Sequence, residues 1–393
     1  MPHERIRHVL PLLKKLGSFS PSVGVLGLRQ VGKTTLITQQ LGIKNCYSLD
    51  DSEIKNEAQT SAKTFLSRIA LPAVLDEVQK APELFDAIKL RIDRKRIPGQ
   101  YYLTGSTEFS SKLGIRESLT GRIATLQLYP LTLAEAYGES FQPKRVLTPI
   151  HSLETRFTAE QAAESLAKGG LPVPLFMRDA SVRSLYFDQW LETAILRDIA
   201  RVFGRSYDPD IARSILDRIG LLLKEGRVPS LGDFKIESRK LRKYLSAMES
   251  IFLLKRLPCH QEGTGLDRWM VGDSGLAASL MRAEHGEGVT LSLARHFVLN
   301  EIFANCQYRG QPIHPHYYKS AQSKEAVDLV WDQVPIKIVH APPSKIPLGW
   351  FEKPVLGAMK KLGSKFGLIV APVDRPTFPK TGGIAIVPWT FWS

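Results

Sequence analysis

The chain has 393 residues, of which 43% are hydrophobic and 23% are charged. This composition is typical of a soluble globular protein, the length favours two or three domains, and no apolar run approaches the roughly 20 residues that a membrane span needs. The formal net charge of +14 favours contact with a polyanion such as nucleic acid, although it also fits a merely basic enzyme.

The first residues, MPHERIRHVLPLLKKLG, carry basic groups at both ends of a short apolar stretch. They lack a small-residue cleavage site, so the pattern predicts an amphipathic helix rather than a signal peptide. Cys46, Cys259 and Cys306 are widely spaced and form neither a disulfide framework nor a Cys-x-x-Cys metal pattern. We therefore expect a cytoplasmic protein with reduced thiols.

An apolar stretch around Val23 and Val25 predicts a buried strand that leads into GLRQVGKTTLITQQLG. Four residues of this segment match the phosphate-loop pattern G-x-x-x-x-G-K-[ST]: Gly27, Gly32, Lys33 and Thr34. Such a loop wraps the β-phosphate with backbone N–H groups, while the lysine reaches the β- and γ-phosphates and the hydroxyl binds Mg²⁺. Thr35 is included among the expected nucleotide-binding residues, and the following LITQQL opens a helix whose N-terminal dipole faces the same phosphates.

A second motif follows in PAVLDEVQKAP, residues 72–82, where an apolar strand ends in Asp76 and Glu77. The carboxyl edge of a parallel sheet is where an α/β fold binds its ligands. Asp76 is placed to hold Mg²⁺ together with Thr34, and Glu77 is the candidate that polarises the attacking water. The two motifs together predict the binding of ATP and Mg²⁺.

A third strand, QYYLTGSTEF, ends in Thr104, Gly105 and Ser106, and a polar side chain there can hydrogen-bond the attacking water. Arg116 and Arg122 follow near the end of this region. An arginine at a subunit or domain edge can stabilise transition-state charge, but a surface position or an internal ion pair is at least as good an interpretation of each.

The order GLRQVGKTT, LDEVQKAP, YLTGS and ESLTGR followed by YPLTLAE resembles the prokaryotic AAA+-type ATPases that carry a DUF4143 domain at the C-terminus. The resemblance implies a five-stranded parallel sheet over residues 1–150. It also implies phosphate and metal binding by Lys33 and Thr34, hydrolysis by Asp76 and Glu77, and a sensor role for Ser106. Arg122 then becomes the more plausible arginine finger.

Residues 151–288 have a helical pattern. QWLETAILRDIARVFG (189–204) has apolar residues at helical spacing and is interpreted chiefly as core, with Arg197 and Asp198 as an internal ion pair. From residue 211 the order helix, turn, helix and two strands predicts a winged helix, in which ESRKLRKYLSAMESI is the second helix. Its basic side chains are candidates for contact with double-stranded DNA, or simply for a solvated face.

Residues 289–393 show a helix followed by three strands, which resembles a restriction-endonuclease-like core. An active site of that kind needs a helix glutamate, a strand aspartate and a Glu-x-Lys on the next strand. The chain has Glu301 and Asp328, but Lys337 stands where the second glutamate is required. We therefore expect a nuclease fold without nuclease activity, in which Lys337 neutralises Glu301 and Asp328; Glu325 is the nearest acid that could restore the site.

The sequence thus predicts an α/β protein with an AAA+-type ATPase domain (1–150), a helical and winged-helix region (151–288) and a restriction-endonuclease-like domain (289–393). The expected activity is Mg²⁺-dependent ATP hydrolysis coupled to a basic C-terminal half that binds DNA. The alternative is a slow nucleotide-controlled switch that binds a protein partner, and an ATP-dependent nuclease is the least favoured possibility. A homo-oligomer is compatible with the sequence, whereas a membrane location is not expected.

Overall fold

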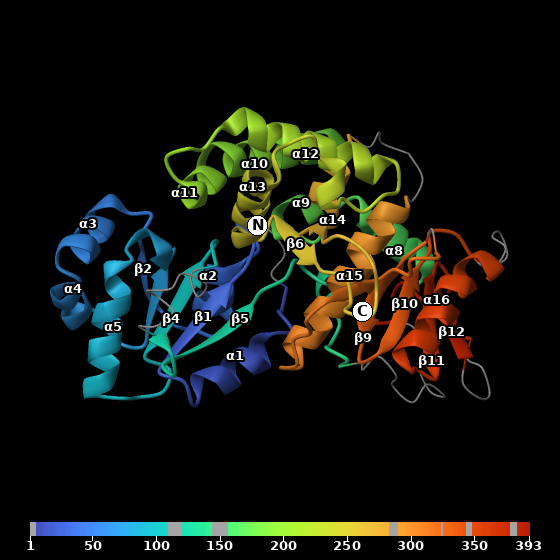
Figure 1. Ribbon diagram of the computed structural model, residues 1–393. Coiled ribbons are helices and arrows are strands. Elements are labelled where there is room, and N and C mark those ends of the chain that lie inside the picture. Colours follow the sequence, from blue (N-terminus) through green and yellow to red (C-terminus); the bar gives the residue numbers. More distant parts are fainter. Residues whose placement is uncertain are drawn as a thin grey trace.

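The computed structural model describes residues 5–108, 119–143, 156–282, 290–323, 325–342, 348–377 and 383–393. Two five-stranded sheets lie toward opposite ends of the molecule, and a group of helices spans the region above and between them (Figure 1). No helix in these ranges is both long enough and apolar enough to cross a membrane.

The first sheet is parallel throughout and has the strand order β2-β3-β4-β1-β5. Its strands are β1 (Ser22–Leu26), β2 (Asn45–Ser48), β3 (Ala73–Asp76), β4 (Tyr101–Gly105) and β5 (Ile123–Gln127). Side chains alternate between its two faces, so that Val74 and Tyr102 join one hydrophobic cluster while Leu75 and Leu103 join another. The predicted five-stranded parallel sheet is confirmed.

Helices cover both faces of this sheet, as a parallel sheet requires. They are α1 (Leu10–Gly17), α2 (Lys33–Thr35) with a π-helical continuation (Leu36–Gln40), α3 (Ser52–Thr60), α4 (Ala62–Arg68), α5 (Glu83–Arg94) and α7 (Leu133–Tyr137). Helix α1 has the predicted amphipathic character, with Leu13 buried and Lys14 exposed.

The helical region begins with α8 (Ala159–Leu166) and α9 (Pro172–Leu175). One long helix follows, made of α10 (Ala180–Thr193), a π-helical stretch (Ala194–Ile199) and α11 (Ala200–Phe203). Next come α12 (Pro209–Lys224), α13 (Ser238–Ser250), the antiparallel strands β6 (Leu254–Leu257) and β7 (Arg268–Val271), and α14 (Ser274–Leu280). This is the predicted order of helix, turn, helix and two strands, and Leu241, Leu245 and Met248 are buried on α13 as expected.

The second sheet has the order β12-β11-β10-β9-β8 and is mixed. It consists of β8 (His316–Tyr318), β9 (Val327–Trp331), β10 (Val334–Ile338), β11 (Phe366–Ala371) and β12 (Gly383–Pro388), with helices α15 (Leu291–Tyr308) and α16 (Leu348–Leu362). The loop between β6 and β7 extends this sheet: His260 N donates to Tyr317 O (2.8 Å) and Tyr317 N donates to Pro258 O (3.1 Å).

The predicted boundaries after residues 150 and 288 lie on segments outside the described ranges. The largest hydrophobic cluster does not divide near them, since it contains Val25 of β1, Leu216 of α12 and Leu329 of β9. The three predicted regions therefore share one core.

Candidate functional site

The carboxyl ends of β1, β3 and β4 meet at one edge of the first sheet, and the predicted phosphate-loop and acidic residues all lie there. The loop after β1 needs glycine at two points. Gly27 (φ 152°) has no room for a Cβ, which would lie 2.4 Å from Leu128 O, and Gly32 (φ 98°) caps the helix that begins at Lys33. Thr35 is exposed in the first turn of that helix.

The Lys33 ammonium is folded back onto its own loop, where it donates to Gly27 O (3.1 Å) and Leu28 O (2.9 Å). Burial lowers the pKa of Lys33, while the carboxylates of Glu77 and Asp76 oppose that shift. The lysine is only 5% exposed. A buried ammonium that contacts only neutral carbonyl oxygens would form a stronger, charge-assisted hydrogen bond with a phosphate that enters the loop.

Asp76 is linked to both neighbouring motifs. Thr34 Oγ1 donates to Asp76 Oδ1 (2.7 Å), and Thr104 Oγ1 donates to the same oxygen. A hydroxyl and a carboxylate in contact are oxygen ligands of the kind that a hard divalent cation takes, usually alongside phosphate oxygens. The residues predicted to hold the metal are therefore adjacent, and their chemistry fits a nucleotide-bound divalent ion.

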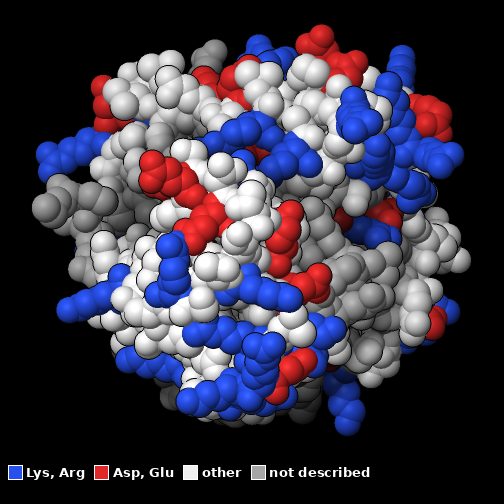
Figure 2. Space-filling view, turned by 90° about the vertical axis from the view of Figure 1, so that its left-hand side faces the viewer, with Lys and Arg blue, Asp and Glu red and all other residues white. Residues whose placement is uncertain are grey.

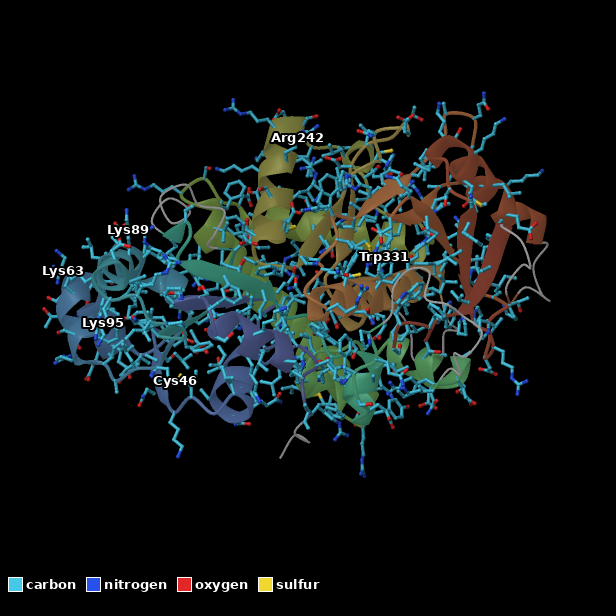
Figure 3. All side chains as sticks on the ribbon, turned by 90° about the horizontal axis from the view of Figure 1, so that it is seen from below. Cys46, Lys63, Lys89, Lys95, Arg242 and Trp331 are labelled. Atoms are coloured by element: carbon cyan, nitrogen blue, oxygen red, sulfur yellow. The ribbon has the colours of Figure 1, made fainter. Side chains whose placement is uncertain are left out.

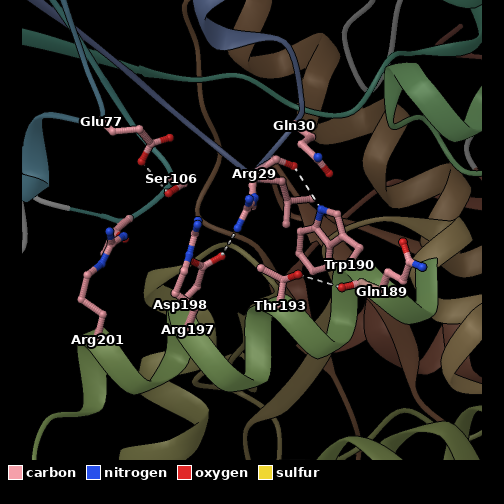
Figure 4. A network of polar contacts seen from close by, with 12 residues as sticks. Arg29, Gln30, Glu77, Ser106, Gln189, Trp190, Thr193, Arg197, Asp198 and Arg201 are labelled. Atoms are coloured by element: carbon pink, nitrogen blue, oxygen red, sulfur yellow. Dashed lines mark hydrogen bonds and ion pairs between the residues drawn. The ribbon is translucent and has the colours of Figure 1, made fainter. Parts of the chain in front are cut away.

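Glu77 and Ser106, the two predicted catalytic residues of adjacent strands, are hydrogen-bonded: Ser106 Oγ donates to Glu77 Oε2 (2.9 Å; Figure 4). The Glu77 backbone has a left-handed conformation (φ 55°), which is uncommon outside glycine, and its N–H donates to Thr104 Oγ1 (3.1 Å). This conformation turns the side chain toward the edge of β4. Six predicted residues thus form one site: Gly27, Gly32, Lys33, Thr34, Asp76 and Glu77, with Ser106 beside them.

Arg122 does not lie in this site. It precedes β5 at the amino end of the sheet, opposite the phosphate loop, and binds Asp93 through two hydrogen bonds of 2.6 and 2.9 Å. The Asp93 carboxylate raises the pKa of Arg122. Any finger role would require a second copy of the chain, so that assignment stays a prediction. Arg116 lies outside the described residues.

The long helix made of α10, its π-helical stretch and α11 brings residues to the site that sequence reasoning did not assign to it (Figure 4). Asp198 is buried and pairs with Arg29 of the phosphate loop (3.5 Å) as well as with its neighbour Arg197 (3.1 Å). The predicted internal ion pair is therefore present, but it is shared with the loop. Arg201 Nη2 donates to Thr107 Oγ1 (3.1 Å), immediately after β4.

Further contacts fasten the same helix to the loop. Trp190 Nε1 donates to Arg29 O (3.4 Å), and Tyr186 OH donates to Gln30 Oε1 (2.7 Å). Part of the signal for this arrangement was present in the sequence, since charged residues at positions 197, 198 and 201 lie among the apolar residues of the predicted helix 189–204. Their partners could not be read from it, because the helix is more than 150 residues away from the loop.

The predicted acid cluster of the C-terminal region is not assembled. Glu301 accepts a hydrogen bond from Leu133 N (2.9 Å) at the start of α7. Lys337, which is 1% exposed, pairs with Glu325 (2.9 Å) and Ala326 O (2.8 Å), not with Glu301. The expectation that Lys337 neutralises Glu301 is therefore wrong, because the Glu301 carboxylate accepts from the backbone of α7 while Lys337 pairs with Glu325.

Asp328 is buried and pairs with Arg295 of α15 (2.8 Å), while Ile338 N donates to its second oxygen (2.8 Å). Burial alone would raise the pKa of Asp328, but the charges of Arg295 and Lys337 lower it on balance. Arg295 also donates to Gly226 O (2.7 Å), so this ion pair joins β9 to the end of α12. The arginine, rather than Lys337, is the main counter-ion that sequence reasoning missed.

The geometry is that of a P-loop nucleotide site. Comparisons with known proteins add a family match for this part of the chain. Residues 20–137 match the family model described as an AAA domain. Uncharacterized proteins of Mycobacterium bovis and Mycobacterium tuberculosis are each 27% identical over 186 residues, which is 47% of this chain. The match covers 37% of the length of each of these relatives.

Three solved structures overlap with the fold at low similarity. A Walker-type ATPase of Pyrococcus abyssi has 14% identity and a TM-score of 0.39, covering 69% of this chain and 94% of its own. The ORC1 protein of Aeropyrum pernix, in complex with DNA, has 16% identity and a TM-score of 0.30 (72% and 94%). A RuvB protein of Thermotoga maritima has 19% identity and a TM-score of 0.28 (64% and 86%).

The family match and the phosphate-loop motif agree on the first part of the chain. Residues 20–137 match an AAA domain, and the phosphate-loop and acidic residues within them fit the binding of a nucleotide with a divalent metal.

Proposed function

We propose that the protein is a Mg²⁺-dependent ATPase whose nucleotide cycle acts on helix α13, and that α13 binds double-stranded DNA. In this proposal Lys33 and Thr34 hold the phosphates and the metal, Asp76 completes the metal site, and Glu77 with Ser106 positions the attacking water. The metal, when bound, neutralises the charge of the phosphates. The residues of the chain orient the nucleotide around it.

The observation that carries the coupling is the position of the long helix over residues 180–203. Its middle contacts the phosphate loop through Asp198 and Arg29 (3.5 Å). Its end packs on α13, where the rings of Phe203 and Tyr244 lie 4.2 Å apart and Lys243 lies 4.0 Å above Phe203. A shift of this helix by phosphates would therefore move α13 directly.

The DNA contact is proposed for α13 rather than for the β6–β7 loop. Arg239, Lys240 and Arg242 are exposed on α13. The β6–β7 loop, in contrast, is hydrogen-bonded to the edge of the second sheet. Thr264 N donates to Lys319 O (2.8 Å), and His260 N donates to Tyr317 O (2.8 Å). A helix with a basic exposed face can lie in the major groove while its basic side chains bind the phosphates that border the groove.

The C-terminal sheet is proposed to be a restriction-endonuclease-like domain of the DUF4143 type without nuclease activity. Asp328 and Lys337 each have a protein ion-pair partner, which favours a structural network over a metal site. A switch that binds a protein partner is the second candidate. It is favoured by the exposed apolar residues Leu185 (61%) and Leu196 (57%) on the long helix.

Steady-state ATPase rates with and without duplex DNA test the proposal. We expect measurable hydrolysis that DNA stimulates, abolition of tight ATP binding by Lys33→Ala, and ATP binding without turnover in Glu77→Gln. An ATPase rate that duplex DNA does not change would favour the switch that binds a protein partner. A wild-type rate in Glu77→Gln would show that Glu77 is not the catalytic carboxylate.

A further inference from the structure

Gln79 lies in the turn that follows β3, two residues after Glu77. The segment Val78–Lys80 forms a short 3-10 helix, and the left-handed backbone of Glu77 begins it. Gln79 is 8% exposed, so that its amide is enclosed beside the site rather than solvated. Nothing in the phosphate-loop or acidic motifs assigns a role to this glutamine.

The amide of Gln79 closes a ring of three side chains. Its Nε2 donates to Glu77 Oε2 and also lies 3.2 Å from Ser106 Oγ, while Ser106 Oγ donates to Glu77 Oε2 (2.9 Å). Both donors thus act on the same carboxylate oxygen. The other oxygen of Glu77, Oε1, is not engaged by this ring.

The second half of the Gln79 amide is unsatisfied. Its Oε1 is buried and has no hydrogen-bond partner in the described part of the chain. A buried acceptor of this kind costs about 1–3 kcal/mol of stability, so a glutamine kept only for packing would be a poor choice. An acceptor held next to a catalytic carboxylate is suited to a water molecule or a hydroxyl group.

We propose that Gln79 is a positioning residue for hydrolysis. With Ser106 it holds Glu77 by Oε2, which leaves Glu77 Oε1 to accept the proton of the attacking water, and Gln79 Oε1 supplies a second acceptor that fixes the orientation of that water. The proposal rests on the proposed ATPase function. It adds a group that acts on the rate of the reaction and not on the affinity for the nucleotide.

The variant Gln79→Met tests this assignment, because methionine keeps the volume of the side chain and removes both polar atoms. We expect kcat for ATP to fall by roughly a hundredfold, the scale of losses from a misplaced reacting group. KM and the affinity for a fluorescent ATP analogue should stay within about twofold, because no phosphate contact is lost. The melting temperature should stay within a few degrees, since the unsatisfied acceptor leaves with the two hydrogen bonds.

Gln59→Met is the matched control. Gln59 Nε2 donates to Lys80 O (2.8 Å), so it supports the same turn from α3 without touching Glu77. A similar fall of kcat in both variants would overturn the proposal, because the turn as a whole would then be responsible. If Gln79→Met fails to fold, Gln79→Leu replaces it, since leucine also lacks both polar atoms of the amide.

The outcome also separates this inference from the proposed function. Wild-type hydrolysis that Glu77→Gln abolishes, together with a normal kcat in Gln79→Met, would overturn the role of Gln79 alone. Absence of hydrolysis in the wild-type protein would overturn the proposed function first. A loss of kcat in Gln79→Met but not in Gln59→Met supports both.

Discussion

Positive side chains from two parts of the sequence converge on the nucleotide site. Lys33 and Arg29 belong to the phosphate loop, whereas Arg197 and Arg201 come from the long helix. The positive charges of Arg197 and Arg201 also act on Lys80. Burial lowers the pKa of Lys80, and these two charges lower it further. Like charges that crowd one another are stabilised by an anion, so this cluster favours the binding of a polyphosphate.

Arg201 is the residue of this cluster for which we expect the largest effect on rate. It is exposed, it lies beside the end of β4, and its contact with Thr107 is a single hydrogen bond, so it is free to meet a phosphate. Arg201→Ala should lower kcat for ATP by about 1,000-fold or more, the scale of the contribution of an arginine that stabilises the transition state. Arg205→Ala, an exposed arginine just beyond the helix, is the control, and steady-state kinetics of both variants is the measurement. Equal rates for the two variants would show that Arg201 does not act in the reaction.

The packing of α12 against α14 depends on one glycine. A Cβ on Gly220 would lie 1.9 Å from Leu280 O, so the backbones themselves approach at this point. Gly220→Ala should reduce the free energy of unfolding by about 3 kcal/mol or prevent folding, because backbone cannot move aside as a side chain can.

Gly357→Ala provides the opposite case on α16, where a Cβ would meet nothing within 4 Å. This exposed helical glycine should gain up to about 1 kcal/mol on replacement by alanine. Denaturant unfolding of the two variants measures both effects. A neutral Gly220→Ala would contradict the close contact of α12 and α14.

Helix α15 carries a buried neutral histidine. His296 Nε2 accepts from Val271 N (3.1 Å) and Nδ1 lies 2.6 Å from Ser292 O, which satisfies both ring nitrogens in the neutral form. Burial lowers the pKa of His296 to about 4. Between pH 4 and pH 6.5, His296 is therefore protonated in the unfolded chain, where its pKa is the ordinary 6.5, but neutral in the folded chain.

Stability due to His296 is accordingly present above pH 6.5 and is lost as the pH falls toward 4, by up to about 3 kcal/mol. Unfolding of wild type and His296→Gln at pH 7 and pH 5 isolates this contribution, because all other titrating groups are common to both proteins. The advantage of the wild type should shrink or reverse at pH 5. A difference that does not change with pH would indicate that His296 binds a proton equally readily in the folded and the unfolded chain, so that burial does not lower its pKa.

At the scale of the whole molecule, basic charge is spread over several surfaces. Figure 2 shows lysine and arginine side chains distributed over the end formed by the first sheet and its helices, with acidic groups between them. In Figure 3, Lys63, Lys89 and Lys95 lie at the end formed by the first sheet, while Arg242 projects from α13, away from these three lysines. The net charge of +14 is therefore not a property of α13 alone.

This distribution sets the control for DNA binding. Neutralising the basic residues of α13, namely Arg239, Lys240, Arg242 and Lys243, should weaken duplex binding and flatten its dependence on salt by about one unit of slope for each lost phosphate contact. A second variant that neutralises Lys63, Lys89, Arg94 and Lys95 removes the same charge from the ATPase end. Affinity measured over a series of salt concentrations distinguishes the two. An equal loss in both would assign the binding to overall charge, and an unchanged α13 variant would move the contact elsewhere.

Local patterns in the sequence predicted the residues of the candidate nucleotide site and the elements on which they lie. Gly27, Gly32, Lys33, Thr34, Asp76, Glu77 and Ser106 were found because a phosphate loop and strand-end acids follow local rules: short spacing, apolar strands and backbone conformations that only glycine tolerates. The burial of one face of α13 was predictable for the same reason, since it follows helical periodicity.

Tertiary structure alone decided which distant groups meet. Arg197 and Arg201 of the long helix lie beside the nucleotide site. Glu301 accepts a hydrogen bond from Leu133 N, and Asp328 forms its ion pair with Arg295 rather than with the predicted partner Lys337. These outcomes depend on how whole helices pack across one shared core, and the partner of a charged side chain is then set by distances between segments far apart in the chain. Local patterns carry no information about those distances, so spacing in the sequence predicted the residue types of the sites but not all of their contacts.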